Sequence, residues 1–468
     1  MKRILLLAIA LVTFLTACAG PMTSNTSEAL IQNEQQKASS DVSKPIEISQ
    51  NDLYANKEDM LSFTGADGKA AYSIVYPENT IEIIHDAAEV LRVALKEATG
   101  KDFKKYSDAT PDADNTYEIL IGNTNRSQSK NTLKEKEYLI KVDGNKIVIS
   151  GGSYYATATA VSEFKNLFSK SSPYIKKDLS IVSSVNTLYR VAASNSGESS
   201  IDIYEITPFN TAPTLVKRFY DIGSTGLNFR WTKEHGEVIV CASGTVVKVI
   251  SYNTGKVIWS KTGIAKSAHG AELLPNGVVA VASSTPNTLS FFDMNGSASK
   301  TVELDDAHAV LWDPKYEVVW AAGYTEIRAY KVTLSSSGAL TVTEDTSKRS
   351  PFNNTGGHDL APVYYDKDKL WISTFGKIYI YDKTTKQYST EIDGDNGIIG
   401  MRRVKGLGNF PDGSMVTTYP DEKADSLYTW TTEKINFYFK YEGKLYYTPI
   451  YTPKMHYYKV RIVCTDYQ

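Results

Sequence analysis

AHGAELLPNGVV at residues 268–279 and AHAVLWDPKYEV at residues 307–318 are two copies of one pattern, and this pattern decides the fold. Each copy reads as a strand, a turn and the start of a second strand. Further copies are LNFRWTKEHGEV at residues 227–238, GHDLAPVYYDKDKL at residues 357–370 and VKGLGNFPDGSM at residues 404–415. Strand signals that repeat about every 40 to 50 residues, with no helix between them, are typical of a β-propeller.

The chain also contains the remaining strands of such a propeller, and its two ends complete the ring. Runs rich in β-branched and aromatic residues follow each copy as second and third strands. Upstream, LYRVAAS at residues 188–194, IDIYEI at 201–206 and TLVKRFY at 214–220 provide three strands of a blade that lacks its first strand. HYYKVRIV at residues 456–463 can supply that strand. The sequence therefore predicts six blades over residues 186–468, closed by the C-terminal strand.

The repeats place a distinctive polar residue at one position of each first strand. The residues six positions before the turn, with one extra position for the fourth, are Asn228, His269, His308, His358 and Lys405. Closure of the ring adds His456 at the start of the C-terminal strand. Because the first strand of every blade lines the central channel, these residues are predicted to meet at one mouth of the channel.

Three neighbouring histidines at one level of a narrow channel can bind one cation. His269, His308 and His358 come from three consecutive predicted blades, and imidazole nitrogens suit zinc, copper, nickel, iron or manganese. These residues are therefore predicted as ligands of one divalent transition metal. The structural alternative is that each imidazole only bonds a loop carbonyl, at a position propagated by duplication of an ancestral blade.

Cationic residues beside the histidines favour an anionic ligand such as an acidic glycan. Arg402 and Arg403 directly precede the Lys405 strand, and as neighbours at most one of them points into the channel. In a β-elimination, a metal or an arginine neutralises the substrate carboxylate while a lysine, histidine or tyrosine takes the proton. Asp306 and Asp359 can orient the neighbouring imidazoles. The predicted catalytic residues are His269, His308, His358, Lys405 and Arg402, and the predicted ligand-binding residues are Asn228, His456 and Arg403.

The N-terminus is predicted to carry an export signal and a lipid anchor. A basic start is followed by an apolar run at residues 4–15, too short for a membrane-spanning helix, and LTAC at residues 15–18 resembles the cleavage box of bacterial lipoproteins. Residues 1–17 would be removed, Cys18 would carry the lipid, and the polar residues 18–57 would form a tether. These features predict a lipoprotein of the bacterial cell envelope that faces outside the cytoplasm. An ordinary secretory peptide is the alternative.

Composition narrows the remaining choices. The chain has 468 residues, of which 42% are hydrophobic and 22% charged, enough apolar material for a large core. Its net charge of -2 provides no basic face for nucleic acid. Cys241 and Cys464 fall in predicted strands, where a free thiol packs as a small hydrophobe, although export permits a disulfide between them. A Cys-x-x-Cys motif is absent from the sequence.

Residues 58–185 are predicted to form a small α+β sandwich before the propeller. AYSIVYP reads as a strand, and residues 83–99 read as an amphipathic helix ended by Gly100. YEILIGNT, EYLIKVDG and NKIVISGG follow as strands, and a second helix is predicted at residues 155–168. The order β-α-β-β-β-α indicates a sheet with both helices on one face.

Part of this region carries a resemblance to known enzymes. ILIGNTNR at residues 119–126, the following hairpin and ATATAVSEFKNLF at residues 156–168 resemble the small domain that precedes the catalytic barrel in family-twenty hexosaminidases and α-glucuronidases. That domain is accessory, so the resemblance implies a carbohydrate context and no catalytic residues, and here a propeller stands in place of the barrel. The propeller half resembles six-bladed domains of bacterial surface lipoproteins of unassigned function. His269 with LPNG at residues 274–277 is similar to a pattern in bacterial aryl sulfotransferases.

Together these features predict a surface lipoprotein that binds a glycan or another anionic ligand at the histidine-lined mouth. The first alternative is a metal-assisted polysaccharide lyase or hydrolase acting on an acidic glycan, since propeller-shaped polysaccharide lyases resemble it in architecture. The second alternative is an aryl-sulfotransferase-like enzyme. A lyase is expected to expose the ring residues around an open pocket, whereas a binding platform is expected to have that mouth plugged by loops or by the small domain.

Overall fold

The computed structural model describes residues 57–111, 116–222, 225–352, 354–395, 397–420 and 429–465. Contacts group the described residues from Leu61 onward into one compact unit. Within the described ranges, no helix is both long and apolar enough to cross a membrane. Cys18, the predicted signal peptide and nearly all of the predicted tether lie outside these ranges.

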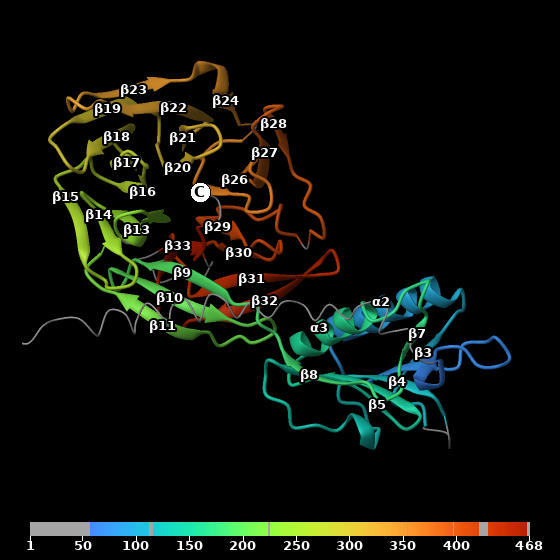
Figure 1. Ribbon diagram of the computed structural model, residues 1–468. Helices are drawn as coiled ribbons and strands as arrows, with labels where there is room; N and C mark the ends of the chain where they lie inside the picture. The colour runs from blue at the N-terminus through green and yellow to red at the C-terminus, as the bar shows by residue number, and fades with distance from the viewer. Residues whose placement is uncertain are drawn as a thin grey trace, which may run out of the picture. The chain divides into compact units, whose positions relative to one another are not determined.

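Six antiparallel sheets form the blades of a β-propeller, as the repeats predicted (Figure 1). From the innermost strand outward, the first three blades are β33 (Tyr457–Ile462), β9 (Tyr189–Asn195), β10 (Ser200–Ile206) and β11 (Thr214–Phe219); β12 (Gly226–Thr232), β13 (Gly236–Ser243), β14 (Val246–Ser251) and β15 (Val257–Thr262); and β16 (Ala268–Leu273), β17 (Val278–Ser283), β18 (Thr288–Asp293) and β19 (Ser299–Glu303).

The other three blades follow the same plan, each built from one continuous stretch of chain. They are β20 (Ala309–Asp313), β21 (Val318–Ala322), β22 (Glu326–Leu334) and β23 (Leu340–Glu344), with the short β24 (Ser350–Pro351) paired to β22; β25 (Asp359–Pro362), β26 (Lys369–Ser373), β27 (Ile378–Asp382) and β28 (Gln387–Ser389); and β29 (Gly406–Asn409), β30 (Met415–Thr418), β31 (Lys434–Tyr441) and β32 (Lys444–Tyr451). The first strands of neighbouring blades contact one another around the whole ring.

The C-terminal strand closes the ring, which confirms the predicted closure. β33 pairs with β9, so that Tyr457 lies opposite Asn195 and Ile462 opposite Val191. The Tyr457 hydroxyl lies 2.7 Å from that of Tyr204 and donates to Asp202 at 2.9 Å, both in β10, the strand on the far side of β9. Residues from the two ends of the chain therefore share one buried polar cluster. Cys241 and Cys464 do not form a disulfide with each other in this structure.

Apolar side chains pack between neighbouring blades and hold the ring together. The short, fully buried strand β17 contributes Val279 and Val281 to one such cluster, against Val238 and Val240 of β13. Every face of these strands is covered by a neighbouring blade, so the strands read as continuous apolar runs.

A buried tryptophan links blades five and six, and its loss has a measurable cost. Trp371 is fully buried, and its Nε1–H donates to Oδ1 of Asn409 at 2.7 Å. A Trp371→Phe variant is expected to lose about 2 kcal/mol of unfolding free energy, because it removes a buried hydrogen bond and leaves a small void. Urea denaturation measures this loss, and an unchanged midpoint would contradict the role given to this contact.

The preceding region is an α+β layer structure, as expected. Its sheet has the order β3 (Lys104–Ser107), β2 (Ser73–Tyr76), β4 (Glu118–Ile121), β6 (Lys146–Gly151), β5 (Glu137–Asp143) and β8 (Ser180–Ser184). The helices are α2 (Glu82–Thr99) and α3 (Tyr154–Lys165), and the short elements are η2 (Lys57–Asp59), η3 (Ser127–Ser129), β1 (Met60–Ser62) and β7 (Tyr174–Lys176). The sequence missed β3 and β8, which are short edge strands with few buried side chains.

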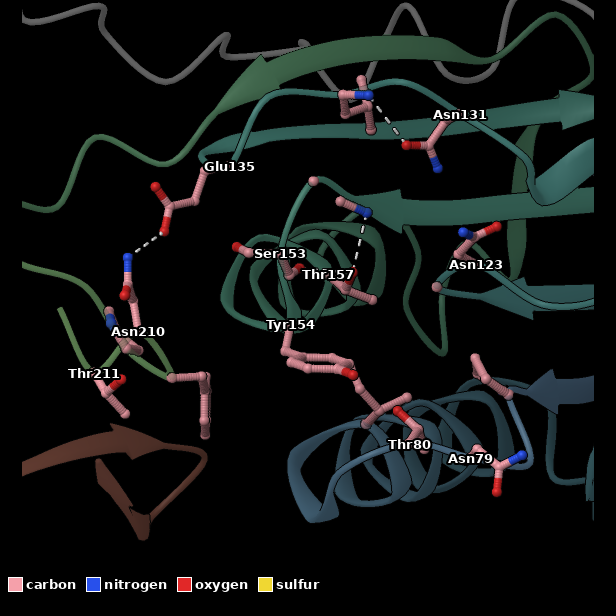
Figure 2. Close-up of a pocket in the computed structure, with 18 residues that line it drawn as sticks. Asn79, Thr80, Asn123, Asn131, Glu135, Ser153, Tyr154, Thr157, Asn210 and Thr211 are labelled. Atoms are coloured by element: carbon pink, nitrogen blue, oxygen red, sulfur yellow. Dashed lines mark hydrogen bonds between the residues drawn. The ribbon is translucent and has the colours of Figure 1, made fainter. Parts of the chain in front are cut away.

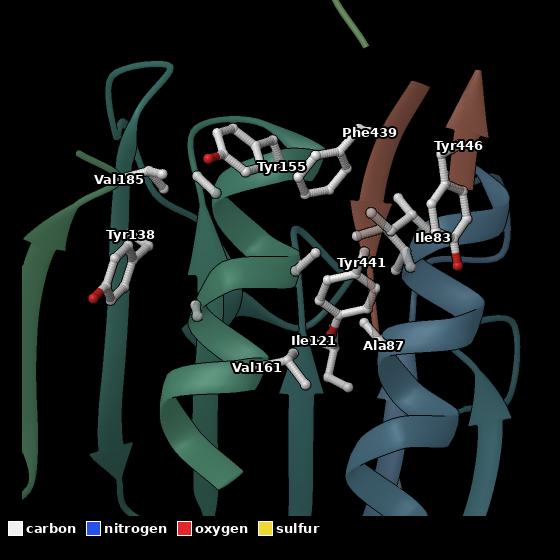
Figure 3. Packing of buried hydrophobic residues seen from close by; sticks show 14 of the residues in the cluster. Ile83, Ala87, Ile121, Tyr138, Tyr155, Val161, Val185, Phe439, Tyr441 and Tyr446 are labelled. Atoms are coloured by element: carbon white, nitrogen blue, oxygen red, sulfur yellow. The ribbon is translucent and has the colours of Figure 1, made fainter. Parts of the chain in front are cut away.

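One hydrophobic core joins the helices to the outer hairpin of blade six (Figure 3). Tyr155 of α3 packs edge-on against Phe439 of β31, with ring centroids 4.9 Å apart. The Tyr446 hydroxyl donates to Asp86 of α2 at 2.5 Å, and Lys444 forms an ion pair with the same carboxylate at 2.8 Å. Tyrosines and phenylalanines near the C-terminal end of the chain are thus used for packing against the helices.

Candidate functional site

In each blade, one residue directly precedes the part of the first strand that pairs with the second strand, and this residue lies at one mouth of the propeller channel. The backbone N–H of this residue donates to a carbonyl of the second strand in four blades, and the donors are Thr225, His308, His358 and Lys405. The imidazole centroids of His269 and His308 are 4.5 Å apart, and those of His308 and His358 are 5.0 Å apart. The Nζ atom of Lys405 lies 3.0 Å from Nε2 of His358. The structure therefore brings the four central predicted residues together.

Two residues predicted for this ring lie elsewhere. In blade two the equivalent position belongs to Thr225, and Asn228 lies deeper in the channel, where its Nδ2 donates to the carbonyls of Ala271 and Val310 at 2.9 and 3.1 Å. The prediction for Asn228 is therefore wrong by three positions, because the β12–β13 hairpin is longer than the others before its turn.

The sixth position of the ring belongs to Tyr458 and not to His456. The Tyr458 ring lies 5.7 Å from that of His269. His456 instead lies beside Gly197 and donates its backbone N–H to Oδ1 of Asn195 at 3.2 Å. A register shift between Tyr457 and Val460 moves the closing strand relative to β9. The distance in sequence from a turn does not predict such a register shift.

The imidazoles of His269 and His308 are held by backbone carbonyls through one nitrogen. Nδ1 of His269 lies 2.6 Å from the carbonyl of Ser267, and Nδ1 of His308 lies 2.8 Å from that of Asp306. Nδ1 must carry the proton to donate to a carbonyl, which leaves a lone pair on Nε2. Within the described ranges, neither Nε2 atom has a hydrogen-bond partner. These two atoms can therefore accept a hydrogen bond from a ligand.

Burial keeps all three histidines neutral near pH 7. Burial, followed by the neighbouring His308, lowers the pKa of His269 to about 3. Burial lowers the pKa of His308 to about 4. Burial and then the Lys405 ammonium hold the pKa of His358 far below its usual range. The imidazoles therefore act as neutral hydrogen-bonding groups and not as cations.

Lys405 is a buried cation that lacks a carboxylate partner. It is 9% exposed, and its Nζ meets His358 and the faces of the Phe375 and Tyr458 rings, at 5.8 and 5.9 Å from their centroids. Among the described residues, no carboxylate lies within 4.0 Å of this nitrogen. Burial, and then the charges of Arg403 and Lys459, lower the pKa of Lys405 to about 8.

A second layer of charge lies below the ring. Asp359, fully buried, accepts from Lys459 Nζ at 3.0 Å and from both terminal nitrogens of Arg461 at 2.6 Å. Burial opposes ionisation of this carboxyl, but the two cations hold its pKa below its usual range. Arg461 also donates to Oδ1 of Asn228 at 3.0 Å. Asp359 therefore pairs with cations in the channel. The sequence had suggested that it orients the imidazole of His358, and the structure does not place it in that role.

Positive charge exceeds negative charge in the described part of this channel. Arg230 forms an ion pair with the fully buried Glu272, and burial lowers the pKa of Lys459 to about 8 despite its pairing with Asp359. The four cations are Lys405, Lys459, Arg230 and Arg461, and the three carboxylates are the buried Glu272 and Asp359 and the less buried Asp306 at the rim. The mouth above them is therefore an environment that favours an anion.

The remaining predicted residues lie at the rim. Arg402 and Arg403 are both exposed, and Arg403 has a φ of 59° and donates its N–H to the Phe375 carbonyl at 3.1 Å. The Asp306 carboxylate lies 3.3 Å from Nδ1 of His308, in line with its predicted orienting role. Tyr458, Phe375, Lys459 and Arg461 were not singled out from the sequence, because their places depend on the register of the closing strand and on a loop.

The histidines at the mouth are largely buried and pack against one another. His308 is 7% exposed and His358 3%, and the three imidazoles contact one another. Within the described ranges, no group of three or more His, Cys, Asp or Glu side chains is arranged to hold a metal ion. Metal binding by His269, His308 and His358, and the catalytic roles, stay predictions.

Comparison with known proteins identifies a family for this chain. A family model described as "Family of unknown function (DUF6528)" matches residues 194–456. No curated protein sequence matches the chain. Among similar solved structures is Kuenenia stuttgartiensis hydrazine synthase, with a TM-score of 0.35 and 12% sequence identity over 51% of this chain and 69% of that chain. Another is the dihydro-heme d1 dehydrogenase NirN, with a TM-score of 0.35 and 14% identity over 57% of this chain and 55% of that chain. A third is the WD40 β-propeller domain of Doa1, with a TM-score of 0.36 and 14% identity over 59% of this chain and 83% of that chain.

Proposed function

The chain belongs to the Family of unknown function (DUF6528), and we propose that its propeller binds a small anionic group, such as the carboxylate of an acidic sugar, at the mouth formed by His269, His308, His358 and Lys405. The observation that carries this proposal is the Lys405 ammonium, which is 9% exposed and has no carboxylate partner among the described residues. A buried charge is costly unless it is paired. An anion from solution would supply the missing partner.

The neighbouring imidazoles complete a site for an acidic sugar. Their Nδ1–H groups are engaged with backbone carbonyls, so the Nε2 atoms of His269 and His308 accept hydrogen bonds. Sugar hydroxyl groups are donors of this kind, and the ring of Tyr458 offers an apolar edge beside His269. A ligand with a carboxylate next to hydroxyl groups would therefore satisfy Lys405 and both imidazoles at once.

Binding is tested by isothermal titration calorimetry with trigalacturonate. Lys405→Met is expected to reduce the affinity at least tenfold, because one charge-assisted hydrogen bond contributes about 1.5 to 3 kcal/mol. Lys300→Met is the matched control, since Lys300 is exposed on β19. Equal affinities for the parent and Lys405→Met would exclude Lys405 as the anion partner.

The affinity is also expected to depend on pH. Lys405 has a pKa of about 8, so it is mostly protonated at lower pH and loses its charge at higher pH. Between about pH 7 and pH 9 the protonated fraction falls roughly tenfold, and the trigalacturonate affinity is expected to fall with it. The Lys405→Met variant is expected to show a flat profile over the same range. A parent profile that rises with pH would contradict this assignment.

A lyase is the alternative that one observation favours. A lysine whose pKa is about 8 has a substantial neutral fraction near pH 8, and a neutral amine can take the proton next to a carboxylate. The amine would take the carbon-bound proton, the carbon–oxygen bond at the adjacent carbon would break, the leaving oxygen would take a proton from water and become a hydroxyl group of the released sugar, and a carbon–carbon double bond would remain. Incubation with polygalacturonate, followed by ultraviolet absorbance of that double bond, separates this alternative from binding alone.

The membrane context proposed for the protein rests on the sequence alone. Fatty acylation of Cys18, with placement in the bacterial cell envelope, would present the binding site outside the cytoplasm. Labelling with a palmitate analogue, compared between the parent and Cys18→Ala, tests the anchor directly. The carbohydrate context suggested by the hexosaminidase-like residues is likewise a proposal, and it agrees with an acidic sugar as ligand.

A further inference from the structure

A second pocket, distinct from the channel mouth, lies between the α+β region and the turn that follows β10 (Figure 2). Its volume is about 700 Å³, within the range of ligand pockets. One wall comprises the start of α3 and the loop after β4, and the opposite wall comprises the turn at residues 208–211. No residue of the histidine ring lines it.

Within the described ranges, several polar groups at this pocket are available for a hydrogen bond to a ligand. The side-chain amides of Asn79 and Asn123 are exposed and have no hydrogen-bond partner within the described ranges. The hydroxyl of Thr80 is buried and likewise has no partner there. Glu135 accepts from Nδ2 of Asn210 at 3.2 Å through one carboxylate oxygen, which leaves the other oxygen available. These groups offer donors and acceptors in close alternation.

An aromatic ring stands among these polar groups. Tyr154 is 43% exposed, and Figure 2 shows its ring between Asn210 and Thr80. Phe209 holds the ring edge-on, with centroids 6.5 Å apart and an interplanar angle of 87°. Phe209 itself has a φ of 66°, a conformation that is strained for a bulky residue and is concentrated at functional sites. The exposed face of Tyr154 is thus positioned for stacking.

The charge of this pocket excludes the kind of ligand proposed for the channel. Glu135 is the one charged residue among the described residues that line the pocket, and neither a lysine, an arginine nor a histidine is among them. An anion would therefore meet a carboxylate and no cation. Amides and hydroxyls beside an aromatic face suit a neutral polyhydroxylated ring, which presents hydroxyl groups at its edge and an apolar face.

We propose that this pocket binds an uncharged oligosaccharide, with one sugar ring stacked on Tyr154 and its hydroxyl groups bonded to Asn79, Thr80, Asn123 and Glu135. This site is independent of the anionic site at the channel mouth. The small domain would then contribute directly to ligand recognition, by presenting its asparagines and Tyr154 opposite the propeller turn.

The test is calorimetric titration of the chain, without its predicted signal peptide, against cellohexaose, xylohexaose and maltohexaose. At least one of these is expected to bind, and Tyr154→Ala is expected to weaken that binding about tenfold, as the loss of one stacking contact would. Asn123→Ala is the second variant, expected to weaken binding severalfold without removing an aromatic core contact. Tyr365→Ala is the matched control, because Tyr365 is 54% exposed and does not line the pocket.

The outcomes separate this site from the channel mouth. Lys405→Met is expected to bind the neutral oligosaccharide with parental affinity, and Tyr154→Ala is expected to bind trigalacturonate normally. Binding of none of the three oligosaccharides would overturn the proposal. Equal affinity in the parent, Tyr154→Ala and Asn123→Ala would overturn it as well, provided that circular dichroism shows the variants folded.

Discussion

An Asp359→Asn variant is expected to lose about 4 kcal/mol of unfolding free energy, the typical cost of breaking a buried ion pair from one side. Asp359 is fully buried and is paired with both Lys459 and Arg461, at 3.0 and 2.6 Å. Asparagine keeps the shape of the side chain but leaves two buried cations without a counter-charge. It also weakens the contact to the backbone N–H of Leu407 at 3.1 Å, which links blades five and six.

Urea denaturation with tryptophan fluorescence measures this loss, and an exposed carboxylate provides the control. Asp143 pairs with Lys141 at 2.8 Å on the surface, and its side chain is 44% exposed. Asp143→Asn is expected to change stability by less than about 1 kcal/mol, as exposed pairs do. Similar losses in the two variants would show that the channel network is not the electrostatic core of the propeller.

Replacement of Lys405 by methionine is expected to do the opposite and stabilise the fold. Lys405 is buried, and within the described part of the chain no carboxylate pairs with it; its pKa falls from 10.5 to about 8 on folding, first because of burial and then because of Arg403 and Lys459. A depression of this size corresponds to roughly 3 kcal/mol of unfavourable burial at neutral pH. Methionine has a similar length and no charge, so Lys405→Met is expected to recover a large part of that free energy.

The stability gained in Lys405→Met is expected to depend on pH, because the buried lysine loses its charge as the pH rises. Below about pH 8 the lysine is protonated in both the folded and the unfolded chain, so the full cost of burying the charge is present. As the pH rises from about 8 towards 10.5, the folded chain loses the proton first and the cost disappears. The stability difference between Lys405→Met and the parent is therefore expected to shrink over that range. A variant that is less stable than the parent at pH 7 would contradict this view of Lys405.

Functional sites often contain a buried charged side chain that lowers the stability of the folded protein. Lys405 and Asp359 lie in one channel and are expected to affect the stability of the fold in opposite directions. Asp359 pairs with two buried cations, whereas Lys405 is a buried cation with no carboxylate partner among the described residues, and we propose that a ligand supplies one. The two expected results differ in direction, so one set of denaturation curves tests both.

Much of the propeller could be predicted because its signals are local and repeated. The turn after each first strand recurs in five blades, and the missing strand of blade one was predicted to come from the C-terminal segment. His269, His308 and His358 were found because each stands at the same distance from a turn, within one residue. The short strands β3 and β8 were missed because edge strands with few buried side chains give a weak apolar pattern.

The rest of the site depends on register and on tertiary contacts. Asn228 was placed wrongly because the β12–β13 hairpin extends to Thr232 and Gly236 before its turn, so that counting from the turn selects a deeper residue. His456 was placed wrongly because of the irregularity in β33, which brings Tyr458 into the ring. The pocket at Tyr154 could not be inferred at all, because its second wall is a propeller turn about fifty residues further along the chain.

The most direct test of the central proposal is an NMR titration of the Lys405 side chain, assigned with Lys405→Met, in the absence and presence of trigalacturonate. The free protein is expected to show a lysine that titrates near pH 8, and bound trigalacturonate is expected to raise that pKa, because an anion stabilises the ammonium. A Lys405 that titrates near its ordinary value of about 10.4, or one whose pKa is the same with and without trigalacturonate, would contradict an anion site at the channel mouth.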